Sequence, residues 1–265
     1  MTSLITGKAA GMCMRWAVGL SLVALSALPS AAQTDFAWQY GRLVNPFTEG
    51  GTKETTSILT FQNASGWKYG GSFFFIDFID DKANDGFNDK EFYGEWYPTL
   101  SLGKVSGRQI TIGPVRDVSL IGGINFDGDA NVLKILPGVQ FSWSLPGFVF
   151  LNTDFTAIVD ASDGIEGGGV PKTSDTGFMF DVSWLLPFKL GSASFAWTGH
   201  AEYISGVTSE LGDKVRSWIL AQPQFTVDVT GEGMLHVGVE LQYWRNKLGT
   251  DNSELSPQLL VVLRM

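Results

Sequence analysis

Apolar and polar side chains alternate along this chain with a period of two residues. The stretch GSFFFIDFIDD, residues 71–81, shows the pattern and the problem it raises, because the acid Asp77 stands among large apolar side chains. Successive side chains of a strand point to opposite faces. One face carries Phe74, Ile76 and Phe78, and the other carries Phe73, Phe75, Asp77 and Ile79. A carboxylate in a dry core is costly, so we expect Asp77 to face water while the wholly apolar face contacts an apolar phase.

Twelve stretches of this kind follow one another, and none shows a long helical period. We predict strands at residues 36–44, 55–63, 71–80, 91–102, 115–126, 132–144, 148–159, 176–187, 192–204, 215–228, 234–245 and 255–265. No linker divides them. All-β barrels of this size form one unit, so residues 33–265 are expected to fold as a single domain.

The connections between the predicted strands alternate between long and short. Long polar connections span residues 45–54, 80–91, 127–131, 160–175, 205–214 and 246–254, and short ones span 145–147, 187–191 and 230–233. Residues 104–114 fit neither set, and residues 64–70 are intermediate. Long loops at one end and tight turns at the other are typical of membrane barrels, in which a closed ring satisfies every backbone group. The predicted fold is therefore all-β, a transmembrane antiparallel β-barrel of about twelve strands, with Asp77 facing the lumen.

The N-terminus has the three parts of a secretory signal peptide. Lys8 and Arg15 precede the apolar stretch WAVGLSLVALSAL, which is followed by PSAAQ. A membrane anchor would need about 20 apolar residues, more than this stretch offers. We predict a signal peptide at residues 1–32, cleaved after Ala32. Because the only cysteine is Cys13, the mature chain is expected to lack thiols, disulfides and cysteine metal sites.

Charge and composition exclude some partners. Losing Lys8 and Arg15 changes the formal net charge from −9 to −11, and a negative surface repels phosphate backbones. Nucleic-acid polymers are therefore not expected as partners. Only 17% of residues are charged and 13% are aromatic, yet no window after the signal peptide offers 18 consecutive apolar residues, so helical spans are not expected either.

The sequence contains no motif that indicates catalysis, a bound metal or a cofactor. The two histidines, His200 and His236, are interpreted as polar lumen residues rather than as ligands or a catalytic base. Two alternatives remain open. One is an outer-membrane hydrolase or acyltransferase with a serine near either histidine, and the other is a plugged barrel that serves as a surface receptor.

The inward positions of the predicted strands combine aromatic rings with acids. Bases stack on aromatic rings with about 1 to 3 kcal/mol each, and carboxylates and amides bind sugar hydroxyls, so a nucleoside fits such a wall. The simpler interpretation is that any water-filled barrel needs polar walls. The candidate substrate-binding residues are Phe73, Phe75, Asp77, Tyr93, Glu95, Tyr97, Asp154, His200, Glu202, His236, Glu240 and Trp244. Further predicted lumen residues are Asp117, Asp181, Asp228, Thr60, Gln62, Gln140, Asn152, Gln222 and Gln224.

Three segments carry a family resemblance: ASGWKYGGSFFFIDF, EFYGEWYPTLSLGKVSG and ITIGPVRDVSLIGG. They resemble the nucleoside-specific outer-membrane channels, the Tsx-like proteins of Gram-negative bacteria. The block from Phe92 to Gly123 is the most specific, and the likeness continues more weakly through LPGVQFSWSLPG and FDVSWLLPF. The resemblance implies a twelve-stranded barrel that passes nucleosides passively. Among the candidate residues, the resemblance extends to Glu95 and to the region around Phe73, Phe75 and Asp77.

The expected protein is thus a monomeric, non-enzymatic channel of the Gram-negative outer membrane. Its expected partners are nucleosides, outer-membrane lipid and the barrel-assembly machinery. The chain departs from the family at its last residue, because outer-membrane barrels commonly end in an aromatic residue and this one ends in Met265. Leu259, Val261 and Leu263 nevertheless keep the outward alternation, so a closing strand is expected.

Overall fold

The computed structural model describes residues 32–83 and 85–265. The predicted signal peptide lies outside the described residues except for Ala32, which is the first residue of β1. The wall strands are β1 (Ala32–Asn45), β2 (Thr52–Trp67), β3 (Gly70–Asp81), β4 (Glu91–Ser101), β5 (Val115–Asp127), β6 (Val132–Trp143), β7 (Phe150–Asp160), β8 (Gly177–Leu190), β9 (Ala193–Ile204), β12 (Trp218–Ala221), β13 (Gln224–Asp228), β14 (Leu235–Arg245) and β15 (Glu254–Arg264).

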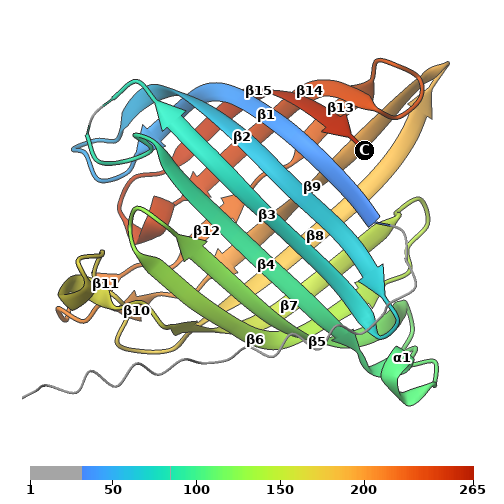
Figure 1. Ribbon diagram of the computed structural model, residues 1–265, viewed down its shortest axis with the longest axis horizontal. Coiled ribbons are helices and arrows are strands. Elements are labelled where there is room, and N and C mark those ends of the chain that lie inside the picture. Colours follow the sequence, from blue (N-terminus) through green and yellow to red (C-terminus); the bar gives the residue numbers. More distant parts are fainter. Residues whose placement is uncertain (1–31, 84) are drawn as a thin grey trace, which may run out of the picture.

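The wall strands form one closed antiparallel barrel (Figure 1). β12 and β13 both pair with β9 and β14 and are two halves of one strand, so the wall has twelve strands. The break falls at Pro223, which lacks a ladder donor, although its carbonyl still accepts from the Leu241 amide at 3.0 Å. β1 closes the ring against β15, from Asp35 opposite Arg264 to Gly41 opposite Gln258. The predicted fold is confirmed.

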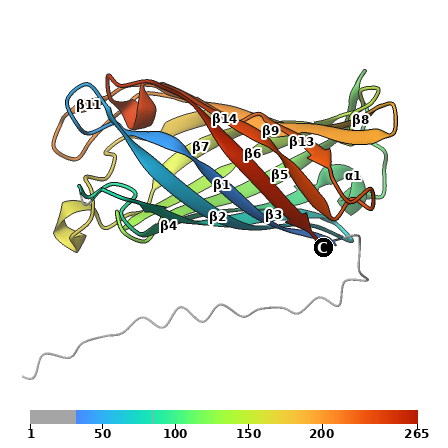
Figure 2. The same cartoon turned by 90° about the horizontal axis from the view of Figure 1, so that it is seen from above.

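The two ends of the barrel differ as the connections predicted. The long connections all lie at the end that carries the hairpin of β10 (Val207–Thr208) and β11 (Lys214–Val215), opposite α1 and the C-terminus (Figures 1 and 2). Residues 104–114 fit neither set because α1 (Leu102–Ser106) extends into this connection. The first turn of α1 is capped by Ser101, whose hydroxyl accepts from the Lys104 amide. Two 3-10 turns, η1 (Gly164–Gly167) and η2 (Lys247–Gly249), lie in the long loops.

The barrel is apolar outside and polar inside. Phe78 and Val239 expose 53% and 51% of their surface on the outer face, whereas Glu240 and Gln258 expose 2% and 1% inside. A soluble protein shows the reverse arrangement, and the apolar outer face needs lipid around it. No helix in the described ranges is long and apolar enough to cross a membrane.

Candidate solute site in the barrel interior

An aromatic wall, which comprises Phe73, Phe75, Tyr93 and Tyr97 on β3 and β4, lines one side of the interior. Phe75 is the centre of a continuous surface, since its ring centroid lies 6.1 Å from that of Phe73 and 6.1 Å from that of Tyr93. Pairing of β3 with β4 sets this arrangement, because Phe73 stands opposite Tyr97 and Asp77 opposite Tyr93. Two strands therefore present four rings on one face.

Glu95 fixes the hydroxyl groups of the aromatic wall. The Tyr93 hydroxyl donates to Glu95 Oε1, and Asn125 Nδ2 donates to the same oxygen at 2.9 Å. Tyr97 Oη donates to Asn125 Oδ1 at 2.9 Å. Both rings are thus held by interior partners, which keeps their faces in a defined orientation.

Gly123 on β5 makes room for Tyr97. A Cβ atom at Gly123 would lie 2.6 Å from the Tyr97 ring and 2.9 Å from the Leu136 side chain. A side chain at position 123 would displace the Tyr97 ring or the Leu136 side chain. The pattern of residues contains no signal for this role, because the glycine only acquires it when β4 and β5 pair.

Asp77 faces the interior as predicted, but a protein partner holds it. Thr60 Oγ1 on β2 donates to Asp77 Oδ1 at 2.5 Å. The Asp77 side chain is also partly exposed to solvent, so this hydroxyl adds to the water that we expected around the carboxylate. A hydroxyl on the adjacent strand β2 therefore provides a partner for the carboxylate that stands among apolar residues in the sequence.

A belt of amide side chains surrounds Glu240 on β14. Gln224 Nε2 donates to Glu240 Oε2 at 2.7 Å, and Gln258 Nε2 donates to Oε1 at 3.0 Å. Gln39 and Gln222 complete the set at 3.5 and 3.4 Å. A buried carboxylate is stabilised when several donors satisfy its oxygens, and this one has four.

A row of acids crosses the interior on β7, β8 and β9. Asp154 stands opposite Asp181, and Asp181 stands opposite Glu202. His200 Nδ1 lies 3.1 Å from Asp181 Oδ1, and its Nε2 lies 2.9 Å from Gln222 Oε1. Glu95 on β4 is four wall strands from Asp181 on β8 and five from His200 on β9. The aromatic wall and the acid row therefore line different sides of the same interior.

The structure does not bring every candidate to the aromatic wall or the acid row. His236 lies beside the β13–β14 turn, where its Nε2 donates to the Gly233 carbonyl at 3.1 Å. Trp244 lies near the loop end, with its ring 5.7 Å from Lys247 Nζ. Asp228, predicted to line the lumen, instead accepts from the turn amides of Thr230 and Gly233.

The hydrogen bonds of the two histidines bear on the hydrolase alternative, and Ser183 on β8 stands directly opposite His200. Among residues 32–83 and 85–265, the ring nitrogens of His200 contact only Asp181 and Gln222, and that of His236 contacts a backbone carbonyl. Neither nitrogen hydrogen-bonds to a serine hydroxyl in this part of the chain. A Ser–His pair within hydrogen-bond reach is what such chemistry needs.

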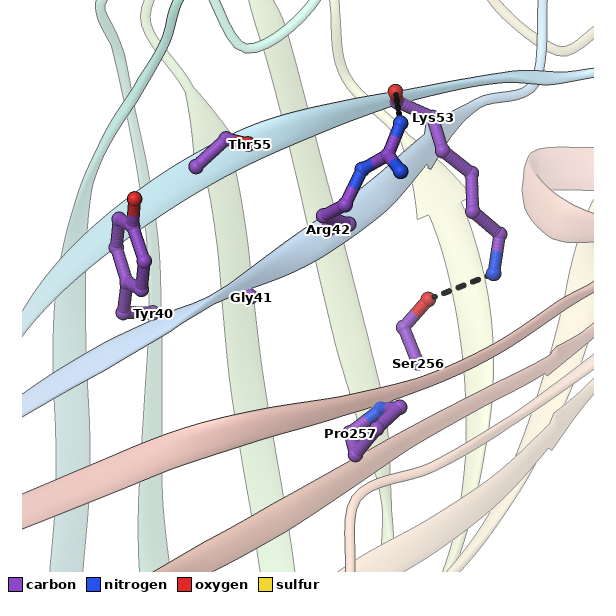
Figure 3. Close-up of a pocket in the computed structure, with 7 residues that line it drawn as sticks. All are labelled: Tyr40, Gly41, Arg42, Lys53, Thr55, Ser256 and Pro257. Atoms are coloured by element: carbon purple, nitrogen blue, oxygen red, sulfur yellow. Dashed lines mark hydrogen bonds between the residues drawn. The ribbon is translucent and has the colours of Figure 1, made fainter.

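A hollow of about 570 Å³ lies on the barrel wall where β1 and β15 separate, not among the candidate residues (Figure 3). Its lining includes Tyr40, Arg42 and Pro257. Lys53 Nζ crosses it to the Leu255 carbonyl at 3.3 Å. This contact supplies a donor to a β15 carbonyl beyond Gln258, the residue of β15 at which pairing with β1 ends.

Among known proteins, this chain has matches in solved structures but not in sequence families or curated sequences. No protein-family model matches the chain, and no curated protein matches it in sequence. The NanC porin structure is 11% identical, with a TM-score of 0.51 over 89% of this chain and 100% of that chain. An outer-membrane channel from Pseudomonas putida F1 gives 10% identity and a TM-score of 0.49 over 90% and 97%. The KdgM porin gives 7% and 0.44 over 87% and 98%.

The likeness to the NanC porin shows a shared fold, which is that of a porin-like outer-membrane β-barrel. It agrees with the closed wall and the apolar outer face described above.

Several interior residues were missed by sequence reasoning. Gln39, Asn125 and Gln258 lie on inward positions of their strands, so the alternation alone would have found them. Lys247 could not have been found, because it lies in a polar loop that folds back into the barrel mouth.

Proposed function

We propose that the chain forms a passive outer-membrane channel selective for nucleosides. One observation carries the proposal: an aromatic wall around Phe75 and a carboxylate row around Asp181 line different sides of the same barrel interior. A nucleoside has one planar apolar part and one hydroxyl-rich part. Its base can stack on Phe75 while ribose hydroxyls donate to carboxylates and amides.

Weak binding is what a passive channel needs. Solutes must bind strongly enough to be selected and weakly enough to leave. One or two stacked rings at about 1 to 3 kcal/mol each, opposed by loss of hydration, fall in that range. The Tsx-like resemblance at residues 92–123 supports the same substrate class and includes Glu95.

The charge of the interior favours neutral solutes. Asp77, Glu95, Asp154, Glu202 and Glu240 all face it. A ring of carboxylates repels anions at close range. Nucleoside monophosphates should therefore pass less readily than nucleosides.

The side chains on the outer face of the barrel support a lipid environment around the protein. Trp38, Trp96 and Trp197 are about 40% exposed there and suit the lipid interface. We propose a monomer in the Gram-negative outer membrane, secreted with the residue 1–32 signal peptide and inserted by the barrel-assembly machinery.

Single-channel conductance of the refolded chain in a planar bilayer tests the binding step. Adenosine should block the current at concentrations at which glucose has no effect, and AMP should block less. If adenosine and glucose affect the current equally, the protein is an unselective pore and the proposed selectivity is wrong. Absence of any current from correctly folded protein would refute the channel.

A further inference from the structure

We propose that Asp181, His200 and Glu202 form a binding site for a divalent transition-metal ion in the barrel interior. One ligand atom from each residue lies within 4.8 Å of the others. Asp181 Oδ1 and His200 Nδ1 are 3.1 Å apart, which matches two ligands that each lie about 2.1 Å from one ion. The inference uses the same row of acids as the proposed nucleoside passage but does not require that passage.

The hydrogen bonds of His200 point to a cation on Nδ1. Its two ring nitrogens face Asp181 Oδ1 and Gln222 Oε1, both of which are acceptors. A neutral imidazole has only one N–H and would leave one acceptor without a donor, so a proton or a metal ion is needed on the second nitrogen. With a metal ion on Nδ1 in place of that proton, Nε2–H donates to Gln222 Oε1 at 2.9 Å, as metal-bound histidines donate to an outer carbonyl.

The orientation of the Gln222 amide is itself fixed. Its Nε2 donates to Glu240 Oε1 and Gln242 Oε1, both at 3.4 Å, which leaves Oε1 for His200. The outer partner of the site is therefore already in position.

The carboxylates beside His200 outnumber the basic side chains that pair with them. Asp154, Asp181 and Glu202 stand directly opposite one another on three adjacent strands, where like charges destabilise a sheet. Asp154 is 9% exposed, and its Oδ1 has no partner within the described residues. Within the described residues, no lysine or arginine forms an ion pair with any of these three acids.

Glu202 is available as a ligand. Neither of its carboxylate oxygens forms a hydrogen bond with any residue in the described parts of the chain, although the side chain is only partly exposed. One imidazole nitrogen with two carboxylates is a donor set that suits Zn²⁺, Co²⁺, Ni²⁺ and Mn²⁺ better than Ca²⁺ or Cu⁺.

Zn²⁺ titration calorimetry on the full chain, refolded in detergent, tests the proposal, and Co²⁺ absorption in the visible range reports the ligands. We expect one ion per barrel. His200→Ala and Glu202→Gln should each weaken Zn²⁺ binding by about 10-fold or more and change the Co²⁺ bands. His236→Ala, which removes the other histidine at a distance from the row, should leave both readouts unchanged.

Heat-modifiable migration in gel electrophoresis verifies that each variant is folded. If His200→Ala fails to fold, Glu202→Gln carries the test, since that carboxylate makes no hydrogen bond that folding depends on. No Zn²⁺ binding by the wild-type chain would overturn the site. Binding that survives Glu202→Gln unchanged, or that His236→Ala removes, would also overturn it.

Discussion

Lys247 Nζ donates to Glu254 Oε2 at 2.6 Å, and the two side chains are 4% and 0% exposed. The pair fills the mouth where the closing ladder ends at Gly41 and Gln258. Lys247 also donates to the Val44 carbonyl at 2.8 Å, and Glu254 Oε1 accepts from the Val44 amide at 3.3 Å. Burial lowers the pKa of Lys247, although Glu254 acts to raise it. Two side chains thus replace the missing backbone partners of β1.

Replacing Lys247 alone should destabilise the barrel. Lys247→Met leaves Glu254 buried without its counter-ion and should cost about 3 to 5 kcal/mol in the free energy of unfolding. Urea titration followed by tryptophan fluorescence measures this cost. Lys214→Met, which changes an exposed loop lysine, is the control. The double variant Lys247→Met/Glu254→Gln should recover part of the loss; no recovery would show that the ion pair is not the cause.

Gly123 should control the position of Tyr97. Gly123→Ala places a Cβ atom against the ring, so we expect a loss of about 1 to 3 kcal/mol in stability and weaker adenosine block. Gly122→Ala is the matched control, because a Cβ atom there meets nothing within 4 Å. Equal behaviour of the two variants would contradict the steric account.

Phe75 should contribute stacking to nucleoside binding. Phe75→Ala should weaken adenosine block of the current by about 1 to 3 kcal/mol, while block by other solutes stays the same. Phe74→Ala removes the same ring from the next residue, on the outer face, and should leave block unchanged. If both variants lose block alike, the effect comes from barrel stability and not from stacking.

Glu95 should help to exclude anions. Glu95→Gln keeps the shape of the side chain and its contact with Asn125 Nδ2, but removes one negative charge from the interior. The reversal potential in a salt gradient should shift toward anions, and AMP block should approach that of adenosine. Glu166→Gln, in the exposed loop, is the control for net charge alone. An unchanged reversal potential would exclude Glu95 from the selective region.

The contact between the long loops should depend on pH. The Thr208 amide donates to Asp175 Oδ1 at 2.6 Å and lowers the pKa of Asp175. A carboxylate whose pKa falls on folding stabilises the fold above the ordinary value of 3.8, and this contribution disappears as the pH falls through the lower folded value. Amide exchange at Thr208 should therefore lose protection in strong acid. In Asp175→Asn this pH dependence should vanish. If it persists, a group other than Asp175 causes it.

Period-two alternation was enough to predict the wall. The predicted strand at 71–80 is one residue shorter than β3 at each end, and the predicted strand at 234–245 begins one residue before β14. Such agreement is possible because a one-residue error in a strand would turn its apolar set into the lumen.

The candidate site was predictable as a set of inward residues but not as contacts. Alternation places Asp77 inside, yet which neighbour satisfies it depends on the register that sets Thr60 opposite it. The placement of Glu95 and His200 around one lumen depends on closure of the whole ring, and the position of Lys247 depends on a loop folding inward. Local sequence encodes neither.

Uptake of labelled adenosine and AMP into liposomes that contain the refolded chain tests the central claim most directly, because it measures passage and not only binding. We predict that adenosine enters down its gradient well before AMP and before a sugar of similar size, and that Phe75→Ala narrows the difference. Equal entry of adenosine and AMP, or no adenosine entry through folded barrels that conduct ions, would contradict the nucleoside channel.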